Sequence, residues 1–169
     1  MSNSDELIEQ LEGYVGFLAS LREVDGVMWA DFISDGKWSV RDIISHIMMW
    51  DKNFLDEIVP KLIYQEPVTL EEDSDVEGFN HQAVEYGKTL IQGQLLDEAI
   101  FYRSEIVSRL RALPDPTFQT VFPGRDSFTL ANFLADLFVG HDAHHKEQIQ
   151  RFLSAEEERF LVEKIGEKI

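Results

Sequence analysis

The chain of 169 residues contains no cysteine. This absence excludes disulfide bonds and thiolate metal ligands. A transition-metal site would have to be built from imidazole, carboxylate and water, which suits zinc, nickel, iron or manganese rather than a cluster. Any metal chemistry therefore depends on the carboxylates and the five histidines.

Basic residues are also scarce, with 15 Lys and Arg against 32 Asp and Glu, which gives a formal net charge of -17. The negative field of such a protein repels phosphate backbones, and no local basic cluster offsets it, so nucleic-acid binding is not expected. No apolar run approaches the roughly 20 residues of a membrane span, so no membrane partner is expected. The acidic N-terminus lacks the pattern of a signal peptide, which favours a cytoplasmic location.

The composition is that of a folded protein, with 44% hydrophobic and 11% aromatic residues. This length forms one domain, 1–169, with a core of its own. Apolar residues recur at helical spacing, and we expect long helices over about 5–24, 39–60, 79–113 and 128–153. A short amphipathic helix over about 154–165 completes the chain.

An acidic, turn-rich segment, 65–78, separates the second and third of these helices. It is either a loop between helices that run in the same direction or a long crossover. Within the third helix, Gly87 and Gly93 loosen the first half. Together the elements predict an all-α fold, a four-helix bundle with a crossover connection and a short extra C-terminal helix.

Two histidines, His141 and His145, lie four residues apart in the fourth helix, on the apolar face that also carries Leu134 and Leu137. This spacing directs both imidazoles the same way and suits two ligands of one metal ion. His46 lies at the edge of the buried face of the second helix, beside Trp50. If the two helices are neighbours, three imidazoles meet, and three protein ligands plus water are typical of an open, catalytic metal site.

The same pattern has a plainer interpretation. His46 by itself is best explained as a core histidine bonded to a carbonyl, and for the pair in the fourth helix the two interpretations are about even. His144 is expected as a neighbour of the site or a solvent-exposed group, and His81 as an exposed loop residue. Other residues near the motifs are expected to be structural: Trp50 at the core edge, Asp51 on the surface and Asn80 as the cap of the third helix. Asp142 and Glu147 either accept a proton from a ligating imidazole or, as is favoured, lie on the solvated face.

Two short motifs resemble those of the DinB/YfiT-like superfamily, bacterial four-helix-bundle metalloenzymes. Residues 37–46, Lys-Trp-Ser-Val-Arg-Asp-Ile-Ile-Ser-His, resemble the Trp-Ser motif that leads to the first histidine of that family. Residues 141–149, His-Asp-Ala-His-His-Lys-Glu-Gln-Ile, are similar to its His-x-x-x-His-x-x-Gln-Ile signature. The resemblance follows the order of the helices over nearly the whole chain, and it is specific in these two motifs.

The resemblance implies a divalent metal, zinc or nickel above all, on His46, His141 and His145. Relatives transfer or isomerise small molecules with low-molecular-weight thiols such as bacillithiol or mycothiol, and they are frequently homodimers. The first functional hypothesis is therefore a metal-dependent thiol transferase. The alternatives are a bundle that sequesters a toxic or stress-related small molecule without turnover, and a metal-free relative, such as a hydrolase, whose imidazoles act as acids and bases.

Overall fold

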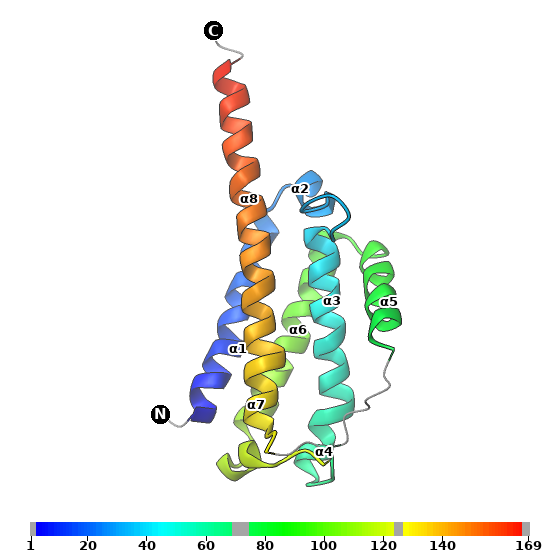
Figure 1. Ribbon diagram of the computed structural model, residues 1–169, viewed down its shortest axis with the longest axis vertical. Helices are drawn as coiled ribbons and strands as arrows, with labels where there is room; N and C mark the ends of the chain where they lie inside the picture. The colour runs from blue at the N-terminus through cyan, green and yellow to red at the C-terminus, as the bar shows by residue number, and fades with distance from the viewer. Residues whose placement is uncertain (1–2, 69–74, 124–126, 167–169) are drawn as a thin grey trace.

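A computed structural model describes residues 3–68, 75–123 and 127–166. Four long helices lie side by side in it (Figure 1): α1 (Asn3–Ser20), α3 (Val40–Asn53), α6 (Gln92–Arg111) and α8 (His141–Gly166). The predicted all-α four-helix bundle is confirmed. Within the described ranges, no helix is both long and apolar enough to cross a lipid bilayer.

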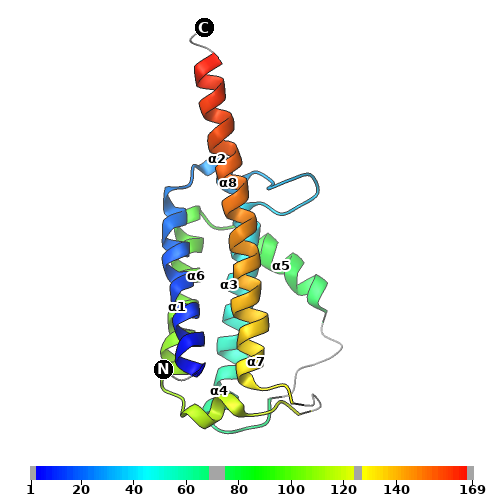
Figure 2. The ribbon, with the colours of Figure 1, turned by 60° about the vertical axis from the view of Figure 1, so that its left-hand side comes forward.

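The connection between the second and third bundle helices is the predicted crossover. Helices α3 and α6 run in the same direction (Figures 1 and 2). The chain between them forms α5 (Val76–Lys88), which lies on the outer side of α3. Residues 69–74 of the acidic segment lie outside the described residues. The crossover therefore places a fifth helical segment against the helix that carries His46.

The prediction of one helix over 79–113 is wrong, because a turn divides it into α5 and α6. The Thr89 hydroxyl and backbone N–H both donate to the carbonyl of Tyr86, which ends α5. Ile91 then takes an extended conformation, and its N–H donates to the Gln94 side chain at 3.3 Å. These local bonds satisfy the backbone groups freed at each helix end.

The second bundle helix begins as predicted, with a capping box in which Ser39 and Asp42 each accept the backbone N–H of the other at 3.1 Å. It does not end at Pro60. A π-helical turn (Phe54–Ile58) leads into α4 (Val59–Ile63), where the proline occupies the first turn. A proline is tolerated there because the first turn of a helix needs no intrahelical N–H bond.

The fourth bundle helix is assembled from α7 (Leu130–Leu134), a π-helical segment (Ala135–Gly140) and α8. The helical structure predicted for 154–165 is present, but it is the far end of α8 rather than a separate helix. No glycine or proline interrupts 141–165, so nothing in the chain ends the helix earlier. This end of α8 extends beyond the other helices (Figure 2).

The core consists of two apolar clusters, one toward each end of the bundle. The first contains Phe54, Phe118, Phe122, Phe133 and Phe138 among its members, and the second contains Tyr14, Trp29, Ile43, Leu95 and Ile149. Arg103 on α6 lies where they meet, because its guanidinium contacts one ring of each cluster, Tyr14 at 4.7 Å and Phe138 at 5.6 Å. A fully buried charge thus occupies the middle of the bundle.

The crossover helix is held close to α3 at a glycine. A Cβ atom on Gly87 would lie 2.6 Å from the Cβ of Ser45, whose hydroxyl donates to the Ala83 carbonyl at 2.5 Å. We predict that Gly87→Ala lowers the free energy of unfolding by roughly 1–3 kcal/mol, because the added methyl group must push α5 away from α3. Chemical denaturation measures this change.

The matched control is Gly13→Ala in α1, where a Cβ would meet nothing within 4 Å. This substitution should stabilise the protein by roughly 0.5–1 kcal/mol through the lower backbone entropy of the unfolded chain. Equal effects of the two substitutions would show that the contact at Ser45 is not tight.

Candidate metal centre

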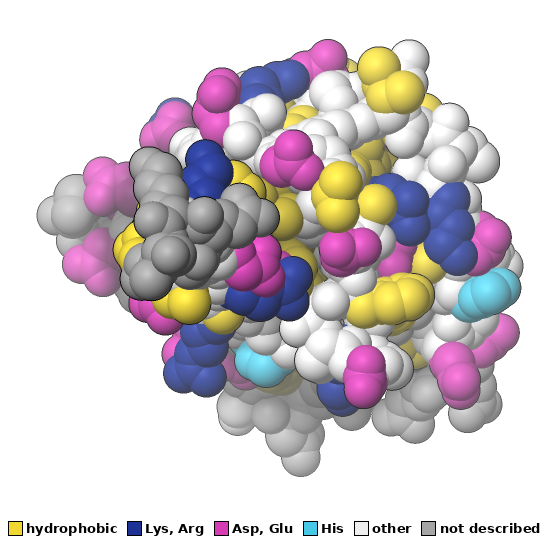
Figure 3. Space-filling view, turned by 90° about the horizontal axis from the view of Figure 1, so that it is seen from above, with side chains coloured by type: hydrophobic (Ala, Val, Ile, Leu, Met, Phe, Trp, Pro, Cys, Tyr) yellow, Lys and Arg dark blue, Asp and Glu magenta, His cyan; other side chains and the backbone are white. Residues whose placement is uncertain are grey.

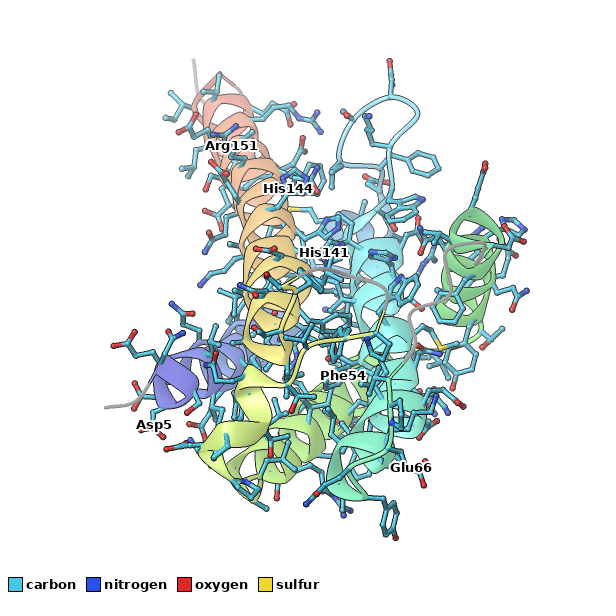
Figure 4. The ribbon with its side chains drawn as sticks, turned by 60° about the horizontal axis from the view of Figure 1, so that its bottom comes forward. Asp5, Phe54, Glu66, His141, His144 and Arg151 are labelled. Atoms are coloured by element: carbon cyan, nitrogen blue, oxygen red, sulfur yellow. The ribbon has the colours of Figure 1, made fainter. Side chains whose placement is uncertain are left out.

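The three histidines singled out by their spacing come together between α3 and α8. Nε2 of His141 lies 3.1 Å from Nε2 of His46 and 3.1 Å from Nε2 of His145. The potential ligand atoms of the three side chains all lie within 4.8 Å of one another. Two nitrogens bound to one zinc at tetrahedral angles are about 3.3 Å apart, so these separations suit a shared ion. Figure 4 shows His141 on the side of α8 that faces α3.

The π-helical segment before His141 sets which residues of the fourth bundle helix face inward. Leu137, expected on the buried face, is 53% exposed, and its neighbour Phe138 is buried instead. The helix phase is shifted because a π-turn contains an extra residue compared with an α-turn. A prediction that treats this segment as a regular α-helix therefore misplaces the buried face by one residue, at Leu137 instead of Phe138.

The orientation of His46 is fixed from α5. Asn80 Oδ1 lies 3.0 Å from Nδ1 of His46 and 2.9 Å from Nε1 of Trp50. An indole N–H can only donate, so the atom that it meets must be the amide oxygen. Nδ1 of His46 therefore carries the proton and donates to Asn80, and the lone pair of Nε2 faces the other histidines.

This role of Asn80 corrects the sequence prediction that it caps a helix. The cap of α5 is Asp75, whose side chain accepts the backbone N–H of Gly78 at 2.9 Å. Trp50 is half-buried as expected at the core edge, and its ring packs against Phe79 at 4.5 Å. Sequence reasoning missed the contribution of α5 because it treated this region as a simple helix start.

His145 is oriented in the same way from its own helix. Its Nδ1 donates to Oε1 of Gln148 at 2.8 Å, one turn further along α8. The Nε2 atoms of both His46 and His145 are then acceptors, and Nε2 of His141 can donate to only one of them. Three ring nitrogens thus face one another with at most one proton between them. A cation at their centre would satisfy the remaining lone pairs, so the donor set fits a metal ion.

All three imidazoles are held in the uncharged form that metals bind. Burial, reinforced by the neighbouring histidines, lowers the pKa of His46 to about 4 and that of His145 to about 4. Burial also lowers the pKa of His141, with His144 and Arg103 adding to the effect. When a metal binds at neutral pH, His46 and His145 therefore have no proton to release from a charged imidazole.

Two aspartates expected on the surface are buried instead. Asp51 and Asp142 are 2% and 6% exposed, and both bind the guanidinium of Arg103. Arg103 itself was not singled out from the sequence. The available signal was its position on the apolar face of α6, one turn before Val107, where an arginine needs a buried partner.

The remaining polar residues lie around the site rather than in it. His144 is exposed, with its ring 5.3 Å from that of His145, and Glu147 is exposed and paired with Arg151 as expected. His81 is exposed as predicted, although it lies on α5 rather than in a loop. It lines a groove of about 490 Å³ together with Trp38, Val76, Glu77, Asn80 and Val84.

The depressed pKa values predict how the metal-free protein responds to acid. As the pH falls from about 6.5 to about 4, unfolded histidines take up protons that the folded His46 and His145 exclude. Above the ordinary histidine pKa this effect is absent. Between that pKa and about pH 4 the free energy of unfolding falls as the pH falls, by up to about 1.4 kcal/mol per pH unit for each histidine. Urea unfolding across this range should show a shallower slope for the double variant His46→Gln, His145→Gln. Parallel slopes for both proteins would contradict the prediction.

Comparison with known proteins places this chain in a family. The model of the DinB superfamily matches residues 17–149. The structure of YfiT from Bacillus subtilis, described as a probable metal-dependent hydrolase with an unusual four-helix bundle topology, is similar, with a TM-score of 0.71 and 25% sequence identity over 88% of this chain and 85% of that one. No curated protein matches the chain. The two family motifs predicted from sequence and the match over most of the chain agree, and the chain belongs to the DinB superfamily.

Proposed function

We propose that this protein is a divalent-metal-dependent enzyme whose ligands are His46, His141 and His145. The observation that carries the proposal is the convergence of three Nε2 atoms that share at most one proton, 3.1 Å apart in two of the pairs. A histidine network in a plain core would pair each donor with an acceptor. Zinc and nickel are the metals that we propose, because both accept imidazole ligands.

The chain's own residues hold the three rings in place. Asn80 and Gln148 fix two of the ring orientations, and such outer hydrogen bonds also make the ligating nitrogen more basic. The Trp38 ring lies 4.9 Å from that of His46 and covers it. When bound with an open position, a divalent metal lowers the pKa of a water or thiol and polarises a carbonyl.

Two reactions fit this site. Hydrolysis uses water as the nucleophile, and it is the activity suggested for the related YfiT. Transfer of a low-molecular-weight thiol to an electrophilic substrate is the second candidate. The site residues do not favour one over the other, because a metal that lowers the pKa of a bound water or thiol supplies the deprotonated nucleophile in either reaction.

Metal content tests the site directly. Elemental mass spectrometry on tag-free protein supplied with zinc or nickel should find about one equivalent of metal in the wild type and none in His141→Ala, because two imidazoles hold a metal too weakly to survive purification. The control is His144→Ala, which removes an exposed neighbouring imidazole and should keep the metal. Circular dichroism of both variants should match the wild type. A metal-free wild type would end the proposal.

Turnover assays separate the reactions. We expect activity on ester, amide or electrophilic substrates that is lost on chelation and restored by the metal. Activity without added thiol identifies a hydrolase, whereas strict dependence on thiol identifies a transferase. Stoichiometric ligand binding without turnover would support the sequestration hypothesis instead, and turnover that survives chelation would support metal-free imidazole chemistry.

We also propose a homodimer, which the projecting end of α8 supports. Leu161 and Ile165 lie one turn apart there and are 59% and 63% exposed. Figure 3 looks down on this end and shows hydrophobic side chains among acidic and basic ones. Burial of such side chains in a subunit interface is favourable. The cytoplasmic location expected from the sequence stays a prediction.

Sedimentation velocity tests the homodimer. The wild type should sediment as a dimer, and Leu161→Glu should shift it to a monomer because a charge cannot be buried unpaired in an interface. Phe101→Glu on α6, at a side chain 57% exposed, is the control that should leave the dimer intact. A monomeric wild type would refute the proposed homodimer.

A further inference from the structure

A buried cluster of three charged side chains lies directly beside the candidate metal centre and has no part in the chemistry proposed above. Arg103 on α6 is fully buried and binds Asp51 on α3 through Nε at 2.8 Å and Nη2 at 2.9 Å. It binds Asp142 on α8 through Nη1 at 2.5 Å and Nη2 at 3.2 Å. The cluster thus joins both helices that carry the three histidines to α6.

The charges of this cluster do not balance. A guanidinium keeps its single positive charge in proteins, so when both carboxylates are ionised the cluster carries an excess of one negative charge. Burying such an excess is unfavourable unless an opposite charge lies nearby. Within the part of the chain that the structure describes, the hydroxyl of Tyr14, whose ring covers Arg103, is buried without a hydrogen-bond partner, and it cannot supply that charge. A divalent cation bound by three neutral imidazoles would supply the opposite charge.

We propose that Asp142, held by Arg103, is a positioning and counter-charge residue for the metal on the three histidines. The proposal rests on the metal site put forward above. Asp142 follows His141 directly in the chain and lies three residues before His145, so it shares the first turn of α8 with one ligand and is one turn from the other. Its carboxylate stabilises the cation through space and does not ligate it, because among the described residues the group of potential ligand atoms within 4.8 Å of one another comes from the three histidines and does not include Asp142.

Asp51 is the natural comparison, because it binds the same guanidinium but lies elsewhere relative to the histidines. It follows His46 by five residues, which is more than one helical turn. Asp142 shares α8 with two of the proposed ligands, whereas Asp51 shares α3 with His46 alone. The two carboxylates should therefore have similar effects on the stability of the ion cluster and unequal effects on the affinity for the metal.

The test compares Asp142→Asn with Asp51→Asn. Each substitution keeps the side-chain size and removes one negative charge from the cluster, so the two should change the free energy of unfolding of the metal-free protein to a similar degree. Zinc affinity, measured by competition with a chromophoric chelator at fixed pH, should fall by roughly 10-fold or more in Asp142→Asn, within the range found for groups that support metal ligands. It should fall by less than about 3-fold in Asp51→Asn, because electrostatic energy decreases with distance.

Equal losses of affinity in the two variants, or no loss in either, would overturn the role of Asp142 while leaving the metal site intact. A wild type that binds no zinc would overturn the site and this inference together. If Asp142→Asn does not fold, Asp142→Glu is compared with Asp51→Glu. Both keep the charge and should keep the affinity within about 3-fold. A 10-fold loss confined to Asp142→Glu would show that the carboxylate acts through its shape rather than its charge.

Discussion

The guanidinium of Arg103 joins three of the four bundle helices in the middle of an otherwise apolar core. Its five N–H donors form a rigid planar fork, and four bonds from this fork reach carboxylates on α3 and α8. Breaking a buried ion pair by removing one partner typically costs about 3–5 kcal/mol. Apolar packing alone allows one helix to slide slightly along another. The four bonds from Arg103 to Asp51 and Asp142 form in only one register of α3 against α8. That register is the one in which His46 faces His141 and His145.

The helices and the three histidines could be predicted because periodicity and spacing are local properties of a chain. A face of apolar residues at helical spacing predicts a helix whatever it packs against, and two histidines four residues apart share a face. The partners of these groups were not predictable in the same way. Asn80 and Arg103 gain their partners from helices that meet only in the folded protein. The position of Arg103 on the apolar face of α6 indicates burial but not which carboxylates it binds, and no local pattern distinguishes Asn80 as a buried contact from a helix cap.

The errors in the predicted elements have local physical causes. The turn between α5 and α6 depends on hydrogen bonds of the Thr89 and Gln94 side chains with nearby backbone groups, which compete with a continuous helix. No proline marks this turn in the sequence. The π-helical segment before His141 shifts the inward face by one residue, which brings Phe138 inside in place of Leu137. Neither feature changes the class of fold, but both change which side chains reach its centre.

The crossover helix α5 stands outside the four-helix core, yet its residue Asn80 determines which nitrogen of His46 is available. The electronic character of one ligand is therefore set from outside the two apolar clusters, neither of which contains a residue of α5. Substitution of Asn80 can change the donor strength of that ligand, and with it the reactivity of anything bound at the centre, without removing a side chain from either cluster. In this protein the side chain that adjusts the ligand is separate from the side chains that form the apolar core.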